Sequence, residues 1–304
     1  MIQESCYLLP NRDSPVQWRD RLVDELNLVA DPAESWRLVY CDSFDWRLHQ
    51  AGALLEGGAV NGSARLLLRG LNGDSTGAEQ VLNARPRFAW ELPEGALRER
   101  LEPLLEMRAL LPRLEIESRV QPLRLLDDED KTVLRLRFEQ HRFKDHDGSV
   151  QGALGQRLRL VPVKGYDKAV ARMRDTLSGE LRLPSADTQP LEQALQALQR
   201  PPGSYSSKLC FRLDPKQRAD AVAKQILLHL LDTLEANVEG AKADLDSEFL
   251  HDLRVATRRT RSALSQIKGV FPAEQVERFK QDFGWIGQVT GPTRDMDVYL
   301  LGFA

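Results

Sequence analysis

The amino-acid sequence predicts an α+β protein in two parts. The first is an N-terminal antiparallel β-barrel or tunnel with flanking helices, and the second is an all-α helical bundle, present in part. Apolar and charged residues alternate as in strands before residue 165, whereas apolar residues have helical spacing after residue 209. A Pro-, Gly- and Ser-rich stretch, RPPGSYSSK at 200–208, marks the boundary. We therefore expect a sheet domain over 1–165, a helical connector and linker over 166–208, and a helical domain over 209–304.

Period-two alternation identifies the expected strands. It occurs at 113–119, 133–139 and 157–160. Stretches with helical spacing at 15–29 and 94–110 flank them. Strands with one apolar and one charged face fit either a sheet wrapped by helices or a closed barrel with a charged lumen. Periodicity leaves a third interpretation open, in which the charged faces simply meet solvent.

Helices account for the rest of the chain. Two short ones are expected in the connector, at 166–177 and 190–198, and four after it, at 215–239, from 247 to about 268, at 273–289, and from Thr293 onwards. Asp214 and Pro215 suit the N-cap and first turn of the helix at 215–239. Asp246 or Ser247 caps the next one.

Composition excludes several classes of protein. The formal net charge of −3 does not support nucleic-acid binding by bulk charge. Cys6, Cys41 and Cys210 lie far apart and form no CxxC pair, which argues against a disulfide framework or a zinc site. No apolar stretch reaches the length of a membrane span, and the N-terminus lacks a signal-peptide pattern. We therefore expect a cytoplasmic protein.

The helix at 251–268 carries an unusual row of cations. Helical spacing places these side chains on one narrow stripe, with Arg259 to its side: His251, Arg254, Arg258, Arg261 and Lys268. No acidic residue interrupts the segment from Arg254 to Val270. Arginine binds phosphate in a bidentate manner, and histidine can gain a proton when an anion arrives. The pattern favours an anion-binding face over a solvated basic face.

This segment also resembles a known family. HDLRVATRRTRSAL, followed some forty residues later by GPTRDMDV, resembles the CHAD domain, the conserved-histidine α-helical domain, over roughly 210–304. The resemblance implies an all-helical fold whose basic surface binds inorganic polyphosphate. It assigns binding to His251, Arg254, Arg258, Arg259, Arg261, Lys268 and Arg294. A CHAD domain is normally longer, with two helical bundles, so we expect this one to be incomplete or the chain to be a fragment.

The N-terminal part resembles a second family. It resembles a degenerate CYTH domain, because five segments follow in the order found in that family: MIQESCYLLP, SWRLVYCDSFDWRLHQAGALLE, ARLLLRG, LDDEDKTVLRLRF and GQRLRLVPVKGYDKA. That resemblance implies a triphosphate tunnel, an antiparallel barrel that binds triphosphate and a divalent metal. The family's E-x-E-x-K motif falls on Ile2, Glu4 and Cys6, where only Glu4 matches. Its basic pair falls on Leu55 and Gly57, neither of which is basic.

Arginines stand where the family places other groups. Arg69 replaces a phosphate-binding lysine, while Arg157 and Arg159 replace metal-binding glutamates. If these side chains point inward together with Arg65, a tunnel could hold an anion through Arg69, Arg135, Arg137, Arg157 and Arg159. Metal-assisted phosphoryl chemistry needs more than the single carboxylate of Glu4. We therefore expect no catalytic residue and no metal site.

These residues leave two main functions open, and a third, more general one. The favoured one is an inorganic polyphosphate-binding protein that uses the basic helical face and carries a catalytically worn tunnel, with polyphosphate or another polyanion as partner and without a cofactor, a specific nucleic acid or a membrane. The alternative is a metal-dependent inorganic triphosphatase using Mg²⁺ or Mn²⁺. A helical domain that meets an acidic protein is a third. No phosphate-binding loop, HExxH or GxSxG motif is present. His141 and His146 lie in a polar, turn-rich stretch, for which a solvated loop is favoured over a metal site. The sequence does not determine the oligomeric state.

Overall fold

The fold consists of two compact units, each described by itself. The computed structural model describes residues 4–10, 14–60, 63–71, 77–186, 188–199 and 201–302. The sheet unit comprises Met1–Cys41, Leu54–Ala84 and Pro112–Pro201, and the helical unit comprises Asp42–Ala53, Arg85–Leu111 and Pro202–Ala304. This division groups residues by their contacts in space and does not define domain boundaries along the chain. The boundaries expected at 165 and 208 therefore stay a prediction.

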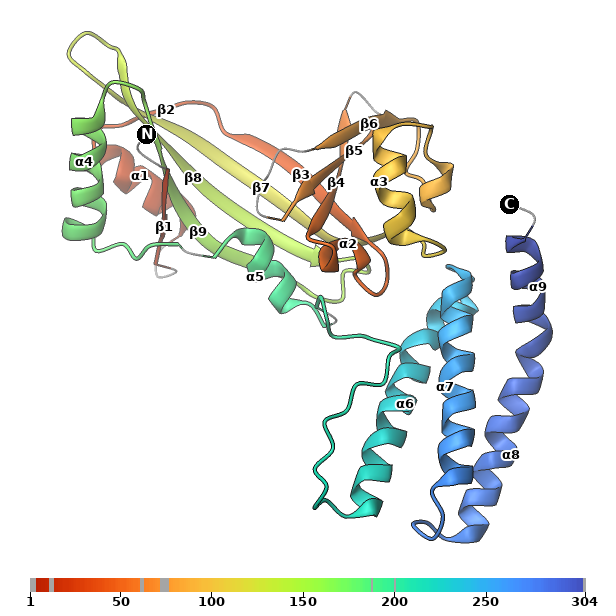
Figure 1. The fold of residues 1–304 in the computed structure, drawn as a ribbon. Coiled ribbons are helices and arrows are strands. Elements are labelled where there is room, and N and C mark those ends of the chain that lie inside the picture. Colours follow the sequence, from red (N-terminus) through yellow and green to blue (C-terminus); the bar gives the residue numbers. More distant parts are fainter. Residues whose placement is uncertain are drawn as a thin grey trace. The chain divides into compact units, whose positions relative to one another are not determined.

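A nine-stranded sheet forms the first unit (Figure 1). The strands are β1 Ser5–Leu8, β2 Val29–Ala30, β3 Glu34–Asp42, β4 Ala53–Val60, β5 Ser63–Gly70, β6 Ala78–Leu82, β7 Leu111–Leu126, β8 Thr132–Asp145 and β9 Gln151–Pro162. Their order is β1-β9-β8-β7-β3-β4-β5-β6, with β2 paired to β7. The expected antiparallel sheet is confirmed, but the described strands do not close into a barrel.

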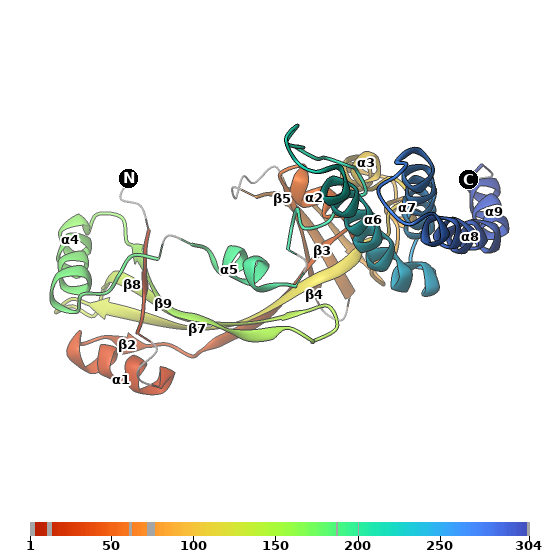
Figure 2. The same ribbon diagram turned by 90° about the horizontal axis from the view of Figure 1, so that it is seen from below.

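The long strands have one apolar face and one charged face, as the alternation predicts. The helices of this unit are α1 Pro15–Glu25, α4 Asp167–Asp175 with the π-helical turn η2 Thr176–Glu180, and α5 Pro190–Ala197. Leu136 and Phe138 of β8 share a buried core with Trp18 of α1 and Val170 of α4. Figure 2 shows α5 on the opposite side of the sheet from α1. The charged face of β8 therefore points away from this core.

Four long helices dominate the second unit (Figure 1). Its elements are α2 Arg47–Gln50, η1 Ala89–Glu91, α3 Ala96–Leu105, α6 Ala219–Lys242, α7 Ser247–Gln266, α8 Ala273–Val289 and α9 Gly291–Leu301. Leu230 and Leu234 of α6 bury against Leu253 and Ala256 of α7. Helix α8 adds only partly buried side chains, among them Phe283.

The helix boundaries largely follow the sequence signals. Asp246 caps α7 as expected, accepting the backbone N–H groups of residues 248 and 249 at 3.0 and 3.2 Å. The expected N-cap at Asp214 is wrong, since α6 begins later and Asp214 instead accepts the N–H of Lys216 within its own turn. Helix α9 begins at Gly291, before the expected Thr293, because proline suits the first helical turn.

One buried arginine connects the parts of the helical unit. Arg108, only 1% exposed, follows α3. Its Nε lies 3.5 Å from the Asp45 carboxylate, its Nη1 3.3 Å from Asp246, and its Nη2 2.7 Å from Asp252. Burial alone would lower the pKa of this guanidinium, but the three carboxylates raise it. The charge therefore persists inside the unit.

Neighbouring groups complete the surroundings of Arg108. The Tyr205 hydroxyl donates to Asp252 at 2.9 Å, and the Asn237 amide donates to that hydroxyl at 2.7 Å. Burial raises the pKa of Tyr205 strongly, so the hydroxyl keeps its proton. The ring of Phe249 lies 5.2 Å from the Arg108 guanidinium carbon. This cluster fixes the start of α7 against residues 42–53 and 85–111.

Replacing the buried cation tests this role. We expect Arg108→Met to lower the free energy of unfolding of the helical unit by about 3–5 kcal/mol, because three buried carboxylates lose their partner. Arg278→Ala serves as the control, since its side chain is 81% exposed and should change stability by about 0.5 kcal/mol at most. Urea unfolding followed by far-ultraviolet circular dichroism measures both. Equal midpoints for the two variants would contradict the role assigned to Arg108.

Candidate anion-binding site

A cavity of about 490 Å³ lies between α7, α8 and the start of α9 in the helical unit. Five side chains that carry or can gain positive charge line it: His251, Arg254, Arg258 and Arg261 of α7, and Arg294 of α9. None of its described lining residues is acidic. The structure therefore brings together five of the seven residues that the sequence assigned to polyphosphate.

Arg258 and Arg261 are the available cations of this cavity. Both are exposed, and no ion pair or side-chain hydrogen bond joins them to another described residue. Along α7, Arg254, Arg258 and Arg261 are spaced by about 6 and 4.5 Å, from a rise of about 1.5 Å per residue. Like charges so close oppose helix formation, so an anion that bound here would relieve their repulsion.

Arg254 and Arg294 hold the helices around the cavity together. Nη1 of Arg254 donates to the Gly287 carbonyl and to Thr290 Oγ1, both at 2.8 Å. Nη1 of Arg294 donates to the Ser247 carbonyl at 2.9 Å. The acceptors of Arg254 carry no formal charge, and the two carboxylates near Arg294 lie 3.8 and 3.9 Å away. The positive charge of Arg254 therefore remains available to an anion, whereas these two carboxylates partly neutralise Arg294.

Glycines form the opposite wall, a feature that the sequence reasoning missed. Gly284 and Gly287 line the cavity on α8. A Cβ atom at Gly284 would lie 3.9 Å from the Arg261 guanidinium, and one at Gly287 would meet nothing within 4 Å. Their spacing of three residues in GWIGQ, one helical turn, was the available signal. Without these glycines, α8 side chains would occupy the space in front of the arginines.

Two of the expected stripe residues lie elsewhere. Nη1 of Arg259 donates to the Ser207 carbonyl at 2.6 Å, because one residue along a helix turns the side chain by about 100°. Lys268 lies beyond the last residue of α7, Gln266. The helix ends before it completes the row, so neither Arg259 nor Lys268 lines the cavity.

A second cavity, of about 390 Å³, lies on the charged face of the sheet unit. Its polar lining includes Glu4, Tyr40, Ser118, Arg137, Glu139, His141, Arg159 and Gln189. Arg137 and Arg159 are the two arginines of the expected tunnel set that line it. Sequence reasoning missed Ser118, Glu139 and His141, although period-two alternation places Glu139 and His141 on the face that carries Arg137.

The remaining arginines of the expected tunnel set do not line this cavity. Arg69 pairs with Glu56 at 3.0 Å, and Arg65 pairs with Glu79 at 2.7 Å. Arg157 is buried and donates to the Thr188 carbonyl and the Gln193 side chain at 2.6 and 2.8 Å. Arg135 is exposed outside the cavity. A lumen lined by all of these arginines is therefore not formed.

The sheet cavity does not fit a divalent metal. Arg159 binds both oxygens of Glu139, at 2.7 and 3.2 Å, and lies 3.8 Å from Glu4. Burial would raise the pKa of Glu139, but the nearby His141 and the hydrogen bonds from Arg159 hold this pKa below its usual value. Mg²⁺ and Mn²⁺ need carboxylate oxygens that no guanidinium occupies. The Ile2 position of the family's motif lies outside the described residues.

Asp145, His146 and Asp147 bring their ligand atoms within 4.8 Å of one another in the β8–β9 turn. The Asp145 carboxylate accepts the Val150 N–H at 3.1 Å and the Ser149 hydroxyl at 2.9 Å. These bonds account for the cluster as a turn, as expected for His146. The same expectation is wrong for His141, which is a buried residue of β8.

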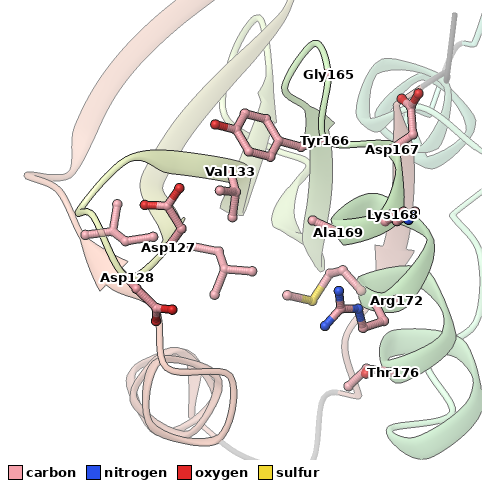
Figure 3. Close-up of a pocket in the computed structure, with 13 residues that line it drawn as sticks. Asp127, Asp128, Val133, Gly165, Tyr166, Asp167, Lys168, Ala169, Arg172 and Thr176 are labelled. Atoms are coloured by element: carbon pink, nitrogen blue, oxygen red, sulfur yellow. The ribbon is translucent and has the colours of Figure 1, made fainter.

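A larger surface cavity, of about 910 Å³, lies between the β7–β8 turn and α4 (Figure 3). Asp127 and Asp128 lie on one side of it, and Lys168 and Arg172 lie on the other. Asp127 accepts two backbone N–H groups of its own turn, at 3.0 and 2.9 Å. Charges of both signs line this cavity without converging on one point, so we assign it no function.

Comparison with known proteins identifies the C-terminal part. Residues 225–304 match the family model of the CHAD domain. The match covers α7, α8 and α9, and with them the whole cavity that contains Arg254, Arg258 and Arg261. The expected order, a sheet domain followed by a CHAD domain, is confirmed. No curated protein matches the chain.

Solved structures similar to this chain cover its N-terminal part. One is a candidate adenylate cyclase from Bacillus halodurans, with 13% identity and a TM-score of 0.38 over 62% of this chain and 94% of that chain. Another is a candidate adenylyl cyclase from Hippeastrum, described as having a dominant triphosphatase activity, with 13% identity and a TM-score of 0.40 over 62% and 92%. A third is the PH1819 protein of Pyrococcus horikoshii, with 11% identity and a TM-score of 0.34 over 64% and 96%.

No described helix of this chain is long and apolar enough to cross a bilayer.

Proposed function

We propose that this protein binds inorganic polyphosphate in the cavity between α7 and α8. The observation that carries the proposal is the convergence of Arg254, Arg258, Arg261, Arg294 and His251 on one cavity without an acidic lining residue. Arginine clusters of this kind recognise phosphate through paired N–H donors. The match to a CHAD domain supports the same ligand.

The shape of the cavity favours a slender chain. One wall carries the arginine row of α7, and on the α8 wall Gly284 and Gly287 present no side chain, so that Gln288 is the one α8 side chain among the described lining residues. Successive phosphates of a linear chain can meet Arg258 and Arg261, which have no described protein partner. A polyanion of this charge density carries condensed counterions, as nucleic acids do, and binding releases them. Binding should therefore weaken steeply with salt.

Removing one available cation tests the site by charge. We expect Arg258→Ala to weaken polyphosphate binding by about tenfold or more, from about 1.5–3 kcal/mol per charged hydrogen bond. The log–log dependence of affinity on salt should also flatten by about one unit. Titration of polyphosphate at several salt concentrations measures both, with Arg278→Ala as a matched control that should change neither. Binding that persists in Arg258→Ala with the same affinity and salt slope would place the site elsewhere.

Filling the glycine wall tests the same site without changing its charge. Leucine at position 287 would project into the cavity, so Gly287→Leu should weaken polyphosphate binding strongly. Gly287→Ala is the matched control, because a Cβ atom there meets nothing within 4 Å and alanine favours the helix by about 0.5–1 kcal/mol. Isothermal titration measures the affinity of both variants, and far-ultraviolet circular dichroism checks that Gly287→Leu is folded. Equal affinity for the two variants would show that polyphosphate does not enter this cavity.

The alternative function is a metal-dependent inorganic triphosphatase in the sheet unit. The observation in its favour is that two carboxylates, Glu4 and Glu139, line the sheet cavity. Against it, Arg159 holds both oxygens of Glu139.

We expect no phosphate release from tripolyphosphate with Mg²⁺ or Mn²⁺, because losing one member of a catalytic set commonly costs orders of magnitude in rate. Incubation of the full chain with tripolyphosphate and either metal, followed by a phosphate assay, makes the test. Turnover that scales with protein and disappears in Glu4→Ala would reverse the assignment.

A further inference from the structure

Three buried polar side chains of the sheet cavity form a row in space, in which each lies next to the following one. Ser118 of β7 and His141 of β8 are partners across the antiparallel ladder, and Glu139 lies two residues before His141 on the same face. Ser118 Oγ lies 2.9 Å from His141 Nδ1, and His141 Nε2 lies 3.5 Å from the Glu139 carboxylate. Their exposed fractions are 5%, 8% and 5%. All three line the cavity.

We propose that Ser118, His141 and Glu139 form a nucleophile–base–acid relay that hydrolyses small carboxylic esters without a metal. This activity is independent of polyphosphate binding, since it belongs to the sheet unit and uses none of the residues of the α7–α8 cavity. The order of groups is that of the serine hydrolases, which recurs on unrelated folds and is recognised by geometry and roles.

The contacts give each member a defined role. With its proton on Nε2, His141 accepts the Ser118 hydroxyl hydrogen at Nδ1 and directs Nε2–H toward Glu139. Two hydrogen bonds from Arg159 orient Glu139. The lowered pKa of Glu139 keeps it ionised, so it can stabilise the imidazolium that forms. The 3.5 Å contact is longer than a hydrogen bond, as catalytic contacts often are before substrate binds.

The reaction balances with water as the only co-reactant. Ser118 Oγ attacks the ester carbonyl while its proton passes to His141 Nδ1. The carbon–oxygen bond to the alcohol then breaks, and the alcohol leaves with that proton. Water attacks the acyl-serine, giving one proton to His141, which returns it to Ser118 Oγ as the acid departs. A covalent acyl intermediate divides one difficult step into two easier ones.

The lining of the cavity defines the class of ester. Arg137 lies two residues before Glu139 on the same face of β8, and no described residue forms an ion pair with it. Because it lines the same cavity, its guanidinium can bind the carboxylate product there. Trp36, Leu38 and Ile116 give the cavity an apolar side. A volume of about 390 Å³ accommodates a short acyl group with a small leaving group.

Hydrolysis of p-nitrophenyl acetate by the full chain makes the first test. Ser118→Ala should lower the rate by about 10²–10⁴-fold, to that of the background reaction, because the nucleophile is gone. His141→Ala should lose a comparable factor. Ser178→Ala, an exposed serine of η2, is the matched control and should leave the rate unchanged. A wild-type rate equal to that of Ser118→Ala would overturn the proposal.

Covalent labelling makes a second test that needs no variant. A fluorophosphonate probe should phosphonylate Ser118, and peptide mass spectrometry of the wild-type protein identifies the modified residue. A label on another residue, or none, would overturn the proposal even if Ser118→Ala failed to fold. Ser118-dependent release from p-nitrophenyl phosphate without release from the acetate would overturn the ester class.

Discussion

The helical unit depends on the charge of Arg108. A buried guanidinium without partners would carry a desolvation cost of several kcal/mol, so its surroundings must supply anions. Asp45 comes from the segment after β3, whereas Asp246 and Asp252 come from the start of α7. Asp246 also caps α7, so one carboxylate both begins the helix and anchors it. The helix that carries the cationic cavity is thereby held at its N-terminal end by these ion pairs together with the buried ring of Phe249.

The two cavities contain similar residues but different chemistry, because their arginines meet different partners. In the helical unit, Arg254 donates to neutral oxygens and Arg258 has no described partner, so positive charge remains for a ligand. In the sheet unit, Arg159 is neutralised by Glu139. A count of arginines in the sequence cannot separate these cases, since neutralisation depends on the strand opposite. The helical cavity therefore retains several cations without a carboxylate partner close by, whereas in the sheet cavity Arg137 is the one described arginine without an ion pair.

Local patterns in the sequence predicted the helices and strands. They could not predict the contacts between side chains of different helices and strands. Alternation in β8 and the cap at Asp246 depend on neighbours in the chain, so they could be derived from the sequence. The contacts of Arg108 with Asp246 and Asp252, both more than one hundred positions along the chain, follow from tertiary packing that no local pattern encodes. The same holds for Arg157, which alternation placed on a charged face but which binds the segment around α5. Gly284 and Gly287 had a visible spacing, but only the facing arginines give it meaning.

Some cations of the α7–α8 cavity hold the helices together and others have no protein partner. This difference is related to the contacts that hold α8 in place. None of the described residues of α8 is fully buried, and Phe283 and Ile286 pack on the α6–α7 core with partly buried side chains. Hydrogen bonds from Arg254 to the Gly287 carbonyl and to Thr290 near the end of α8 supply a fixed link. Arg294 returns α9 to the first turn of α7 in the same manner. These two arginines therefore link the three helices that line the cavity, whereas Arg258 and Arg261 have no side-chain partner among the described residues.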